Sequence, residues 1–149
     1  MNKTMFTIGV FAIILDSDNK ILICHRLDHD FWNLPGGGLE SRETPEMGVI
    51  REVKEETGLD VVIEKLTGVY AKENKDNLAF SFLCRVVGGG ITLNDEADII
   101  EYFNLDNIPN NFPPKQLERI KDYFDNPNKT HYKLQAGKDT VDLFREGKL

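Results

Sequence analysis

Cysteine is scarce in this chain of 149 residues, which contains only two, and long apolar runs are missing. Cys24 and Cys84 lie inside apolar, strand-like stretches, so we predict buried thiols in a reducing compartment, not a disulfide or a metal site. No stretch is long and apolar enough to cross a membrane. The N-terminal segment has an apolar run but no small-residue cleavage site, which is more typical of a strand than of a signal peptide. These features predict a cytoplasmic protein without membrane association.

Positive charge is also in the minority. The chain has 18 Lys and Arg residues against 25 Asp and Glu residues, for a net charge of −7 at pH 7. This charge disfavours tight non-specific binding of nucleic acids or anionic membranes, so we predict no stable nucleic-acid complex. Bound cations would invert the local field for an anionic substrate. Length and composition predict a single domain over residues 1–149, and they leave a homodimer open.

Against this background, three glutamates share an unusual spacing. Glu52, Glu55 and Glu56 follow one another at i, i+3 and i+4, which on a helix places three carboxylates on one face. Like charges at this spacing destabilise a helix by a few tenths of a kcal/mol per pair. Hard divalent cations with oxygen ligands are the natural partners for such a cluster. The alternative is a solvated acidic face, which is the usual role of acidic residues on a helix.

The residues around these glutamates predict the limits of the helix. Thr44 is a typical N-cap, Pro45 suits the first helical position, and Gly58 is a typical stop signal. We expect an apolar stripe beside the acidic stripe to pack on the core, formed by Val49, Ile50, Val53 and Thr57. Gly48 falls between Glu52 and Glu55 on the acidic stripe. Our hypothesis is that a side chain at Gly48 would crowd the metals or phosphates.

Apolar, β-branched stretches elsewhere predict strands over residues 6–15, 20–24, 61–71, 78–87 and 99–105. The turn signal at residues 16–19 predicts that the first two strands form a hairpin. Gly88 to Gly90 predict a tight connection after which residues 91–93 continue the sheet. Strands and helices therefore intermix, which predicts a mixed, antiparallel-rich sheet between helices.

The C-terminal part of the chain has two different patterns. Pro113 and Pro114 are expected to open a helix that runs to about Phe124, because apolar residues recur there at helical spacing. The following turn signal ends this helix. Residues 129–149 are polar with scattered apolar positions, and three alternatives stay open for them: a strand, a helix or a mobile segment.

The stretch from Gly37 to Leu59 resembles the full signature of the Nudix hydrolases. That signature is Gly, five residues, Glu, seven residues, Arg-Glu, an aliphatic residue, any residue, Glu-Glu, any residue, Gly and an aliphatic residue. No position departs from it, and the matching residues are Gly37, Glu43, Arg51, Glu52, Val53, Glu55, Glu56, Gly58 and Leu59. The resemblance implies the α/β/α sandwich of that family, an α/β (α+β) fold. It also implies Mg²⁺-dependent hydrolysis of a nucleoside diphosphate linked to another group, with Mn²⁺ as an alternative metal.

The resemblance also implies roles for individual residues. Glu52, Glu55 and Glu56 match the metal ligands of the family, and Gly37 is a further metal-site residue. Arg51 is interpreted as the partner that orients a carboxylate of the signature. The general base differs between family members, so Glu52, Glu55 and Glu96 all stay candidates. Glu96 resembles the loop glutamate that some members use, and an exposed loop carboxylate is the alternative.

The segment before the signature is expected to bind the substrate. Gly36, Gly37 and Gly38 permit backbone conformations and close approaches that other residues do not allow. Trp32 either stacks on a base or anchors the loop by packing. Arg26 ends the second strand, where family members often carry a basic residue near the substrate, and it either contacts phosphate or is an ordinary surface arginine.

The signature indicates the chemistry but not the leaving group. We expect a small-molecule nucleotide, either a nucleoside triphosphate, which leads weakly, or a nucleotide-sugar-like compound. ADP-ribose pyrophosphatases of the family usually carry a proline soon after the signature, and here none lies between Pro45 and Pro109. This weighs against ADP-ribose without excluding it. A nucleotide sensor that does not hydrolyse its ligand and a plain acidic scaffold are the two alternatives from other functional classes.

Overall fold

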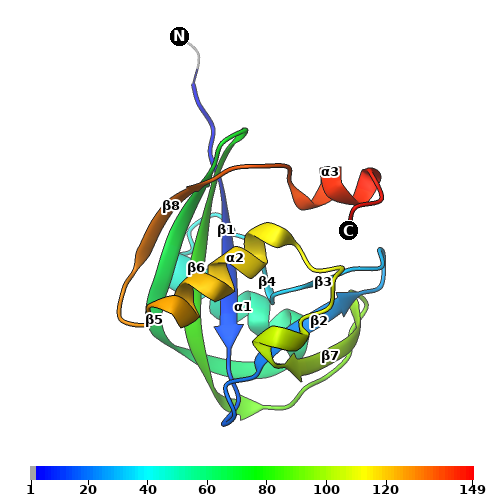
Figure 1. Cartoon of the computed structure of the whole chain (residues 1–149). Helices are drawn as coiled ribbons and strands as arrows, with labels where there is room; N and C mark the ends of the chain where they lie inside the picture. Colours follow the sequence, from blue (N-terminus) through cyan, green and yellow to red (C-terminus); the bar gives the residue numbers. More distant parts are fainter. Residues whose placement is uncertain (1–2) are drawn as a thin grey trace.

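The computed structural model describes residues 3–149 of the chain. Its larger sheet is mixed (Figure 1). In spatial order its strands are β4 (Gly36–Gly38), β1 (Thr7–Ile14), β6 (Lys75–Gly89), β5 (Leu59–Lys72) and β8 (His131–Gln135). The β1–β6 and β5–β8 pairs are parallel, whereas β1–β4 and β5–β6 are antiparallel. The predicted mixed, antiparallel-rich sheet is therefore confirmed.

A second, smaller sheet is fully antiparallel. Its strands, in spatial order, are β3 (Trp32–Asn33), β2 (Ile21–Arg26) and β7 (Ala97–Phe103). The predicted hairpin of β1 and β2 is wrong, since the two strands belong to different sheets and share only an isolated bridge between Leu15 and Ile21. The physical reason is that β4 and β6 already pair with the two edges of β1.

Helices cover both faces of the larger sheet, as the α/β/α prediction requires (Figure 1). The helical elements are α1 (Pro45–Thr57), the 3₁₀ helix η1 (Leu105–Asn107), α2 (Pro114–Asp125) and α3 (Thr140–Arg145). Alternate residues of β1 point to opposite faces. Val10 packs in one buried cluster with Val49 and Val53 of α1, and Ile13 packs in another with Ile120 of α2.

Helix α1 begins and ends where the sequence predicts. The Thr44 hydroxyl accepts a hydrogen bond from the Met47 N–H at 3.2 Å, and Gly58 adopts the left-handed conformation at φ 81°. The buried stripe consists of Gly48, Val49, Val53 and Thr57. Ile50 is 39% exposed, so its placement in the core was wrong. It lies one 100° step round the helix from the row formed by Val49 and Val53.

Gly48 faces the sheet and not the metal site that our hypothesis assumed. A Cβ atom at Gly48 would lie 2.6 Å from Leu39 Cδ1, 3.2 Å from Glu43 Oε1 and 3.5 Å from Val10 Cγ2. The glycine therefore lets α1 approach β1 and the loop before the helix closely. Our hypothesis about crowded metals or phosphates was wrong, because this position packs against Leu39.

Three further predictions are decided by the structure. Residues 91–93 lie outside the strands, so they do not continue the sheet. The segment 129–149, left open above, forms β8 and α3. Cys24 and Cys84 are buried free thiols, as predicted. Among residues 3–149, no helix is long and apolar enough to span a membrane.

Candidate active site

The candidate site forms where α1 packs against the short strand β4. A Cβ atom at Gly37 would lie 2.7 Å from Glu52 Oε1, so a side chain at this position would displace the Glu52 carboxylate from the strand. The Gly36 N–H donates a hydrogen bond to Glu56 Oε2 at 2.9 Å. Strand β4 is held in place by antiparallel pairing with β1. The glycines thus place main-chain groups directly beside two carboxylates of the helix.

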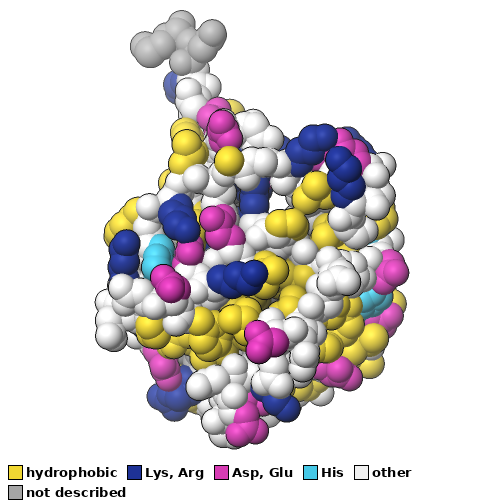
Figure 2. Space-filling model, viewed as in Figure 1, with side chains coloured by type: hydrophobic (Ala, Val, Ile, Leu, Met, Phe, Trp, Pro, Cys, Tyr) yellow, Lys and Arg dark blue, Asp and Glu magenta, His cyan; other side chains and the backbone are white. Residues whose placement is uncertain are grey.

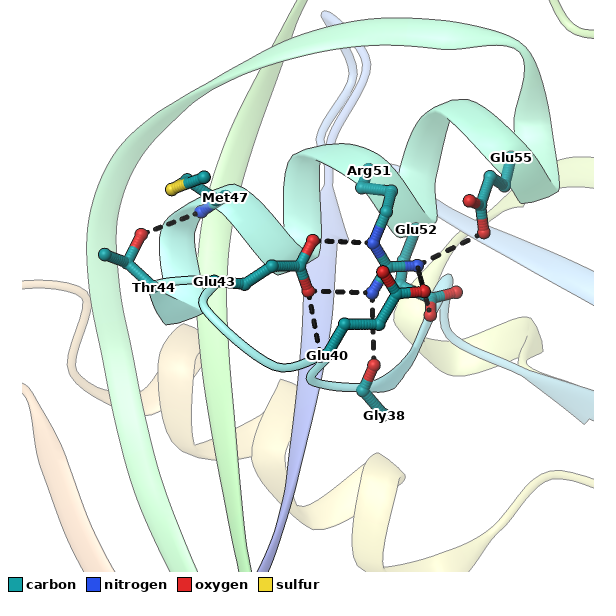
Figure 3. A network of polar contacts seen from close by, with 8 residues as sticks. All are labelled: Gly38, Glu40, Glu43, Thr44, Met47, Arg51, Glu52 and Glu55. Carbon is teal, nitrogen blue, oxygen red and sulfur yellow. Dashed lines mark hydrogen bonds and ion pairs between the residues drawn. The ribbon is translucent and has the colours of Figure 1, made fainter.

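Arg51 connects most of the other acidic residues (Figure 3). Its Nε and Nη2 donate to the two carboxylate oxygens of Glu43 at 2.7 and 3.0 Å. Its Nη1 lies 3.0 Å from Glu52 Oε1 and 3.2 Å from Glu55 Oε2. Nη2 also donates to the Gly38 carbonyl at 3.1 Å. This arrangement fits the interpretation that Arg51 orients carboxylates; its contribution to catalysis stays a prediction.

The three glutamates do not converge as the helical spacing alone predicted. Glu52 and Glu55 both turn toward Arg51, whereas Glu56 turns toward Gly36. Their surroundings differ as well, because the Glu52 side chain is 13% exposed and that of Glu55 is 59% exposed. Within residues 3–149, no three such side chains form a ready group of metal ligands. The cause is the guanidinium of Arg51, which takes two of the three carboxylates.

Burial and like charge shift the ionisation of the two inner glutamates. The pKa of Glu56 is raised to about 8, mainly by burial; the charges of Glu52 and Glu96 also raise it, and the Gly36 hydrogen bond opposes the shift. Burial also raises the pKa of Glu52, although Arg51 opposes that shift. A hard divalent cation takes carboxylate oxygens as ligands and would replace the proton that burial favours on Glu56. The residue types present therefore fit the metal that the Nudix signature implies, although among residues 3–149 the side chains are not gathered into a ready ligand group.

The raised pKa of Glu56 predicts how stability depends on pH. Protonated Glu56 contributes to the free energy of unfolding because the folded state favours the proton. This contribution is fully present below the ordinary pKa of 4.5 and is lost as the pH rises through about 8. We expect metal-free protein to lose roughly 1–4 kcal/mol of unfolding free energy across this range, relative to Glu56→Gln. Urea unfolding of both proteins without metal measures the difference. A difference that stays constant with pH, or that matches the exposed control Glu46→Gln, contradicts this expectation.

A cleft of about 310 Å³ opens beside Glu56, and its lining includes Arg26, Asn33, Gly36 and Glu96. The Glu96 carbonyl accepts from the Leu27 N–H at 2.9 Å, which fixes the loop backbone at this edge. Glu96 and Glu56 are close enough for their charges to interact. The structure thus brings Glu96 and Arg26 together with Glu56, although they are far apart in the sequence.

Arg26 and Trp32 are each held by neighbours. The Arg26 Nε donates to Asp28 Oδ1 at 2.8 Å, and the guanidinium lies 4.9 Å from the centre of the Phe31 ring. The Trp32 ring is half-buried and packs edge-on against His25 and Phe103, each with ring centroids 5.1 Å apart. These contacts favour the packing role for Trp32. They leave Arg26 at the cleft, where a phosphate contact stays a prediction.

Two residues outside the signature hold the loops of the cleft, and sequence reasoning missed the first of them. The Asn94 side chain hydrogen-bonds the Glu56 carbonyl, and its Oδ1 accepts from the Glu96 N–H at 2.8 Å. His25 lies 2.7 Å from an Asp98 carboxylate oxygen and 2.8 Å from one of Asp30, which together raise its pKa. An asparagine opening an acidic loop is a known turn signal and could have indicated the first residue.

Comparison with known proteins agrees with this geometry. The family model of the NUDIX domain matches residues 5–125. A MutT-like protein of Streptomyces ambofaciens is 32% identical over 137 residues, which cover 92% of this chain and 88% of that protein. An ADP-ribose pyrophosphatase of Methanocaldococcus jannaschii is 39% identical over 118 residues, covering 74% of this chain and 69% of the relative. The chain belongs to the NUDIX domain family.

Solved structures show the same fold. A NUDIX hydrolase from Nitrosomonas europaea superposes with a TM-score of 0.80 at 23% identity, covering 91% of this chain and 82% of that one. An ADP-ribose pyrophosphatase from Streptococcus suis superposes with a TM-score of 0.71 at 28% identity, covering 85% and 98%. Relatives named as pyrophosphatases or diphosphatases support a Nudix pyrophosphohydrolase.

Proposed function

We propose that this protein hydrolyses a phosphoanhydride bond in a nucleoside diphosphate linked to another group. The observation that carries the proposal is the contact of the glycine backbone of β4 with Glu52 and Glu56, whose pKa values are both raised. In the reaction, water adds to a phosphorus atom and the bridging P–O bond breaks. The products are two phosphate monoesters, or a monoester and pyrophosphate when the substrate is a nucleoside triphosphate.

A hard divalent cation, Mg²⁺ or Mn²⁺, is part of this proposal. Glu52, Glu55 and Glu56 would hold it, together with the backbone at Gly37. When bound, such a cation neutralises phosphate charge and lowers the pKa of a water molecule. Among residues 3–149, the exposed Glu55 side chain makes one polar contact, with Arg51, and gives it up when it turns to this role.

The remaining roles belong to the side chains of the cleft. Arg26 binds a phosphate oxygen of the substrate, because a guanidinium matches that geometry. Glu96 accepts the proton of the attacking water, for which it must lie within hydrogen-bond reach of that water. Arg51 keeps the carboxylate of Glu52 in position through the contacts described above. Gly36 to Gly38 let the phosphates approach the main chain.

The names of the relatives suggest which substrates to test. One relative is named an ADP-ribose pyrophosphatase and another a dihydroneopterin triphosphate diphosphatase, and one similar structure is titled a UDP-X diphosphatase. ADP-ribose therefore belongs in the substrate panel, although the proline that often accompanies this activity is missing after the signature. Nucleoside triphosphates and nucleotide sugars complete the panel.

A nucleotide sensor without hydrolytic activity is the second candidate function. A sensor would need the cleft to bind its ligand but would not need carboxylates that hold a metal or accept a proton. The complete set of signature glutamates and the loop residue Glu96 at the same cleft favour hydrolysis. Both functions predict binding of nucleotides, and only hydrolysis predicts release of phosphate monoesters.

Metal binding gives the first test. We expect Mg²⁺ or Mn²⁺ to raise the melting temperature by several degrees near pH 8, because a ligand that binds only the folded state stabilises it. The shift should be smaller near pH 5, where Glu56 is protonated. Differential scanning fluorimetry measures it, with Glu56→Gln as the test variant and Glu101→Gln, on an exposed position of β7, as the control. Equal shifts in the wild type and in Glu56→Gln would contradict the assignment.

A further inference from the structure

A second pocket lies on the other side of β4 from the glutamates of α1. It has a volume of about 370 Å³, and its lining includes Gly37, Gly38, Lys72, Lys115, Gln116 and Arg119. We call it the basic pocket. Figure 2 shows the face between α2 and α3 hollowed, with Lys or Arg atoms visible in the hollow. Gly37 and Gly38 line this pocket, and the same two residues lie against Glu52 and Arg51 of α1, so only β4 separates the basic pocket from the signature carboxylates.

Arg119 is the most unusual residue of the basic pocket. It is 3% exposed, and its guanidinium lies between the rings of Phe11 and Tyr70, at 5.2 and 5.4 Å from their centres. Its Nε donates to Gln135 Oε1 at 3.0 Å. Among residues 3–149, neither Nη1 nor Nη2 has a hydrogen-bond acceptor. Neither atom is among the fully buried side-chain atoms without a partner, so these N–H groups open into the pocket and can donate to an acceptor that binds there.

The charges around Arg119 are also unbalanced. Asp139 is the carboxylate shared by three lysines: its Oδ1 lies 2.7 Å from Lys115 Nζ and 3.5 Å from Lys72 Nζ, and its Oδ2 lies 2.7 Å from Lys75 Nζ. These lysines hold the pKa of Asp139 well below its usual range in spite of burial. One carboxylate therefore faces four cationic side chains, Arg119 included. Glu118 of α2 is also near, but it binds Gln135 and Lys133.

Burial lowers the pKa of Lys72; Asp139 opposes this shift, and the positive charges of Arg119 and Lys115 add to it. This excess of positive charge is local, since the whole chain carries a net charge of −7. A planar guanidinium held between two rings is preorganised for the two oxygens of a phosphate or carboxylate. An anion bound there would satisfy Arg119 and balance the lysines.

We propose that the basic pocket binds an anionic group, a phosphate or a carboxylate, on the part of the substrate that lies beyond the cleaved bond. This inference rests on the proposed function, which it deepens by naming the class of substrate. Asp139 and Thr140 of the pocket lie outside residues 5–125, the part matched by the family model. The charge balance of the pocket is therefore set partly by the C-terminal segment of this chain.

The first test uses inorganic phosphate and metal-free protein, so that it does not depend on hydrolysis. Calorimetry should show phosphate binding to the wild type and binding at least about tenfold weaker to Arg119→Gln and Lys72→Met, as expected for lost charge-assisted hydrogen bonds. Lys133→Met is the matched control, because Lys133 pairs with Asp122 outside the basic pocket. Absence of binding to the wild type, or equal binding to all four proteins, overturns the proposal. Binding that persists in both pocket variants identifies an adventitious ion only.

The second test compares two substrates that differ by one distant phosphate, ADP-ribose and ADP-ribose 2′-phosphate. The wild type should favour the phosphorylated compound in kcat/KM at least about tenfold, and both pocket variants should lose the preference through KM with kcat retained. Melting curves confirm that Arg119→Gln is folded; if it is not, the half-buried Lys72→Met carries the test. Hydrolysis without any preference overturns this inference and leaves the proposed function intact. Phosphate binding that the two pocket variants lose, without hydrolysis of either compound, supports the basic pocket and counts against ADP-ribose as the substrate.

Discussion

Glu56→Gln is expected to fold normally and to be nearly inactive, and Glu55→Gln is expected to be strongly impaired. Each substitution keeps the size of the side chain but removes a negative charge that holds a hard cation. Because a metal contributes several kcal/mol of transition-state stabilisation, we expect kcat to fall on the order of 10³-fold for Glu56→Gln. The fold should survive, since the buried residues Val49 and Val53 are untouched.

The measurement is steady-state hydrolysis at saturating Mg²⁺, with circular dichroism as a check of folding. Glu46→Gln is the matched control, because Glu46 lies in the first turn of α1, away from the carboxylates of the cleft. Without metal, Glu56→Gln should be at least as stable as the wild type, as it removes repulsion. Folded variants of Glu55 and Glu56 with near-normal turnover would show that the cluster is only a solvated acidic face.

Glu96→Gln is expected to lower kcat by about 10²- to 10⁴-fold, the usual contribution of a general base. KM should change little where it reflects binding. The structure supports this role because Glu96 lies in the lining of the cleft with Glu56 and Arg26, on a loop whose backbone is hydrogen-bonded to Leu27 and Asn94. The amide of glutamine keeps the shape of the side chain but cannot accept the proton from water.

Pre-steady-state and steady-state rates over a range of pH measure this effect. Glu101→Gln serves as the control, because Glu101 is an exposed carboxylate on β7, the strand that follows the loop of Glu96. A loss of only a few-fold would return the role of base to a signature glutamate, with Glu52 as the next candidate.

Local features of the fold were predictable from the sequence. The limits of α1 follow from Thr44, Pro45 and Gly58, whose effects act within one turn of the helix. Helical spacing also gives the side of α1 on which the glutamates begin, but it does not give the different partners to which Glu52, Glu55 and Glu56 turn. Ile50 shows the limit of this reasoning, because a single step round the helix decides between the core and solvent.

Pairing between distant segments was not predictable in the same way. The β1–β2 hairpin was expected from its turn signal, but β1 instead takes β4 and β6 as neighbours. The sequence pattern of a strand indicates that it is buried but not which partner buries it. Which strand pairs with an edge depends on the whole topology.

The same distinction between local and distant features applies to the candidate site. The signature glutamates were found because they are close in the sequence, whereas the role of Arg51 as a bridge between three carboxylates required side-chain positions. The basic pocket was missed altogether. Its cations come from β5 and α2 and its carboxylate from the C-terminal segment, so no short stretch of sequence contains the pattern.

The most direct test of the central claim is hydrolysis in isotopically labelled water. Purified protein with Mg²⁺ is incubated with ADP-ribose, a nucleotide sugar and a nucleoside triphosphate, and the products are identified by mass spectrometry. We predict that at least one substrate is split at its phosphoanhydride bond, with one labelled oxygen in one phosphate product, and that Glu56→Gln forms far less of this product in the same time. Nucleotide binding by the folded wild type without labelled product from any of the three would contradict the claim and favour the sensor.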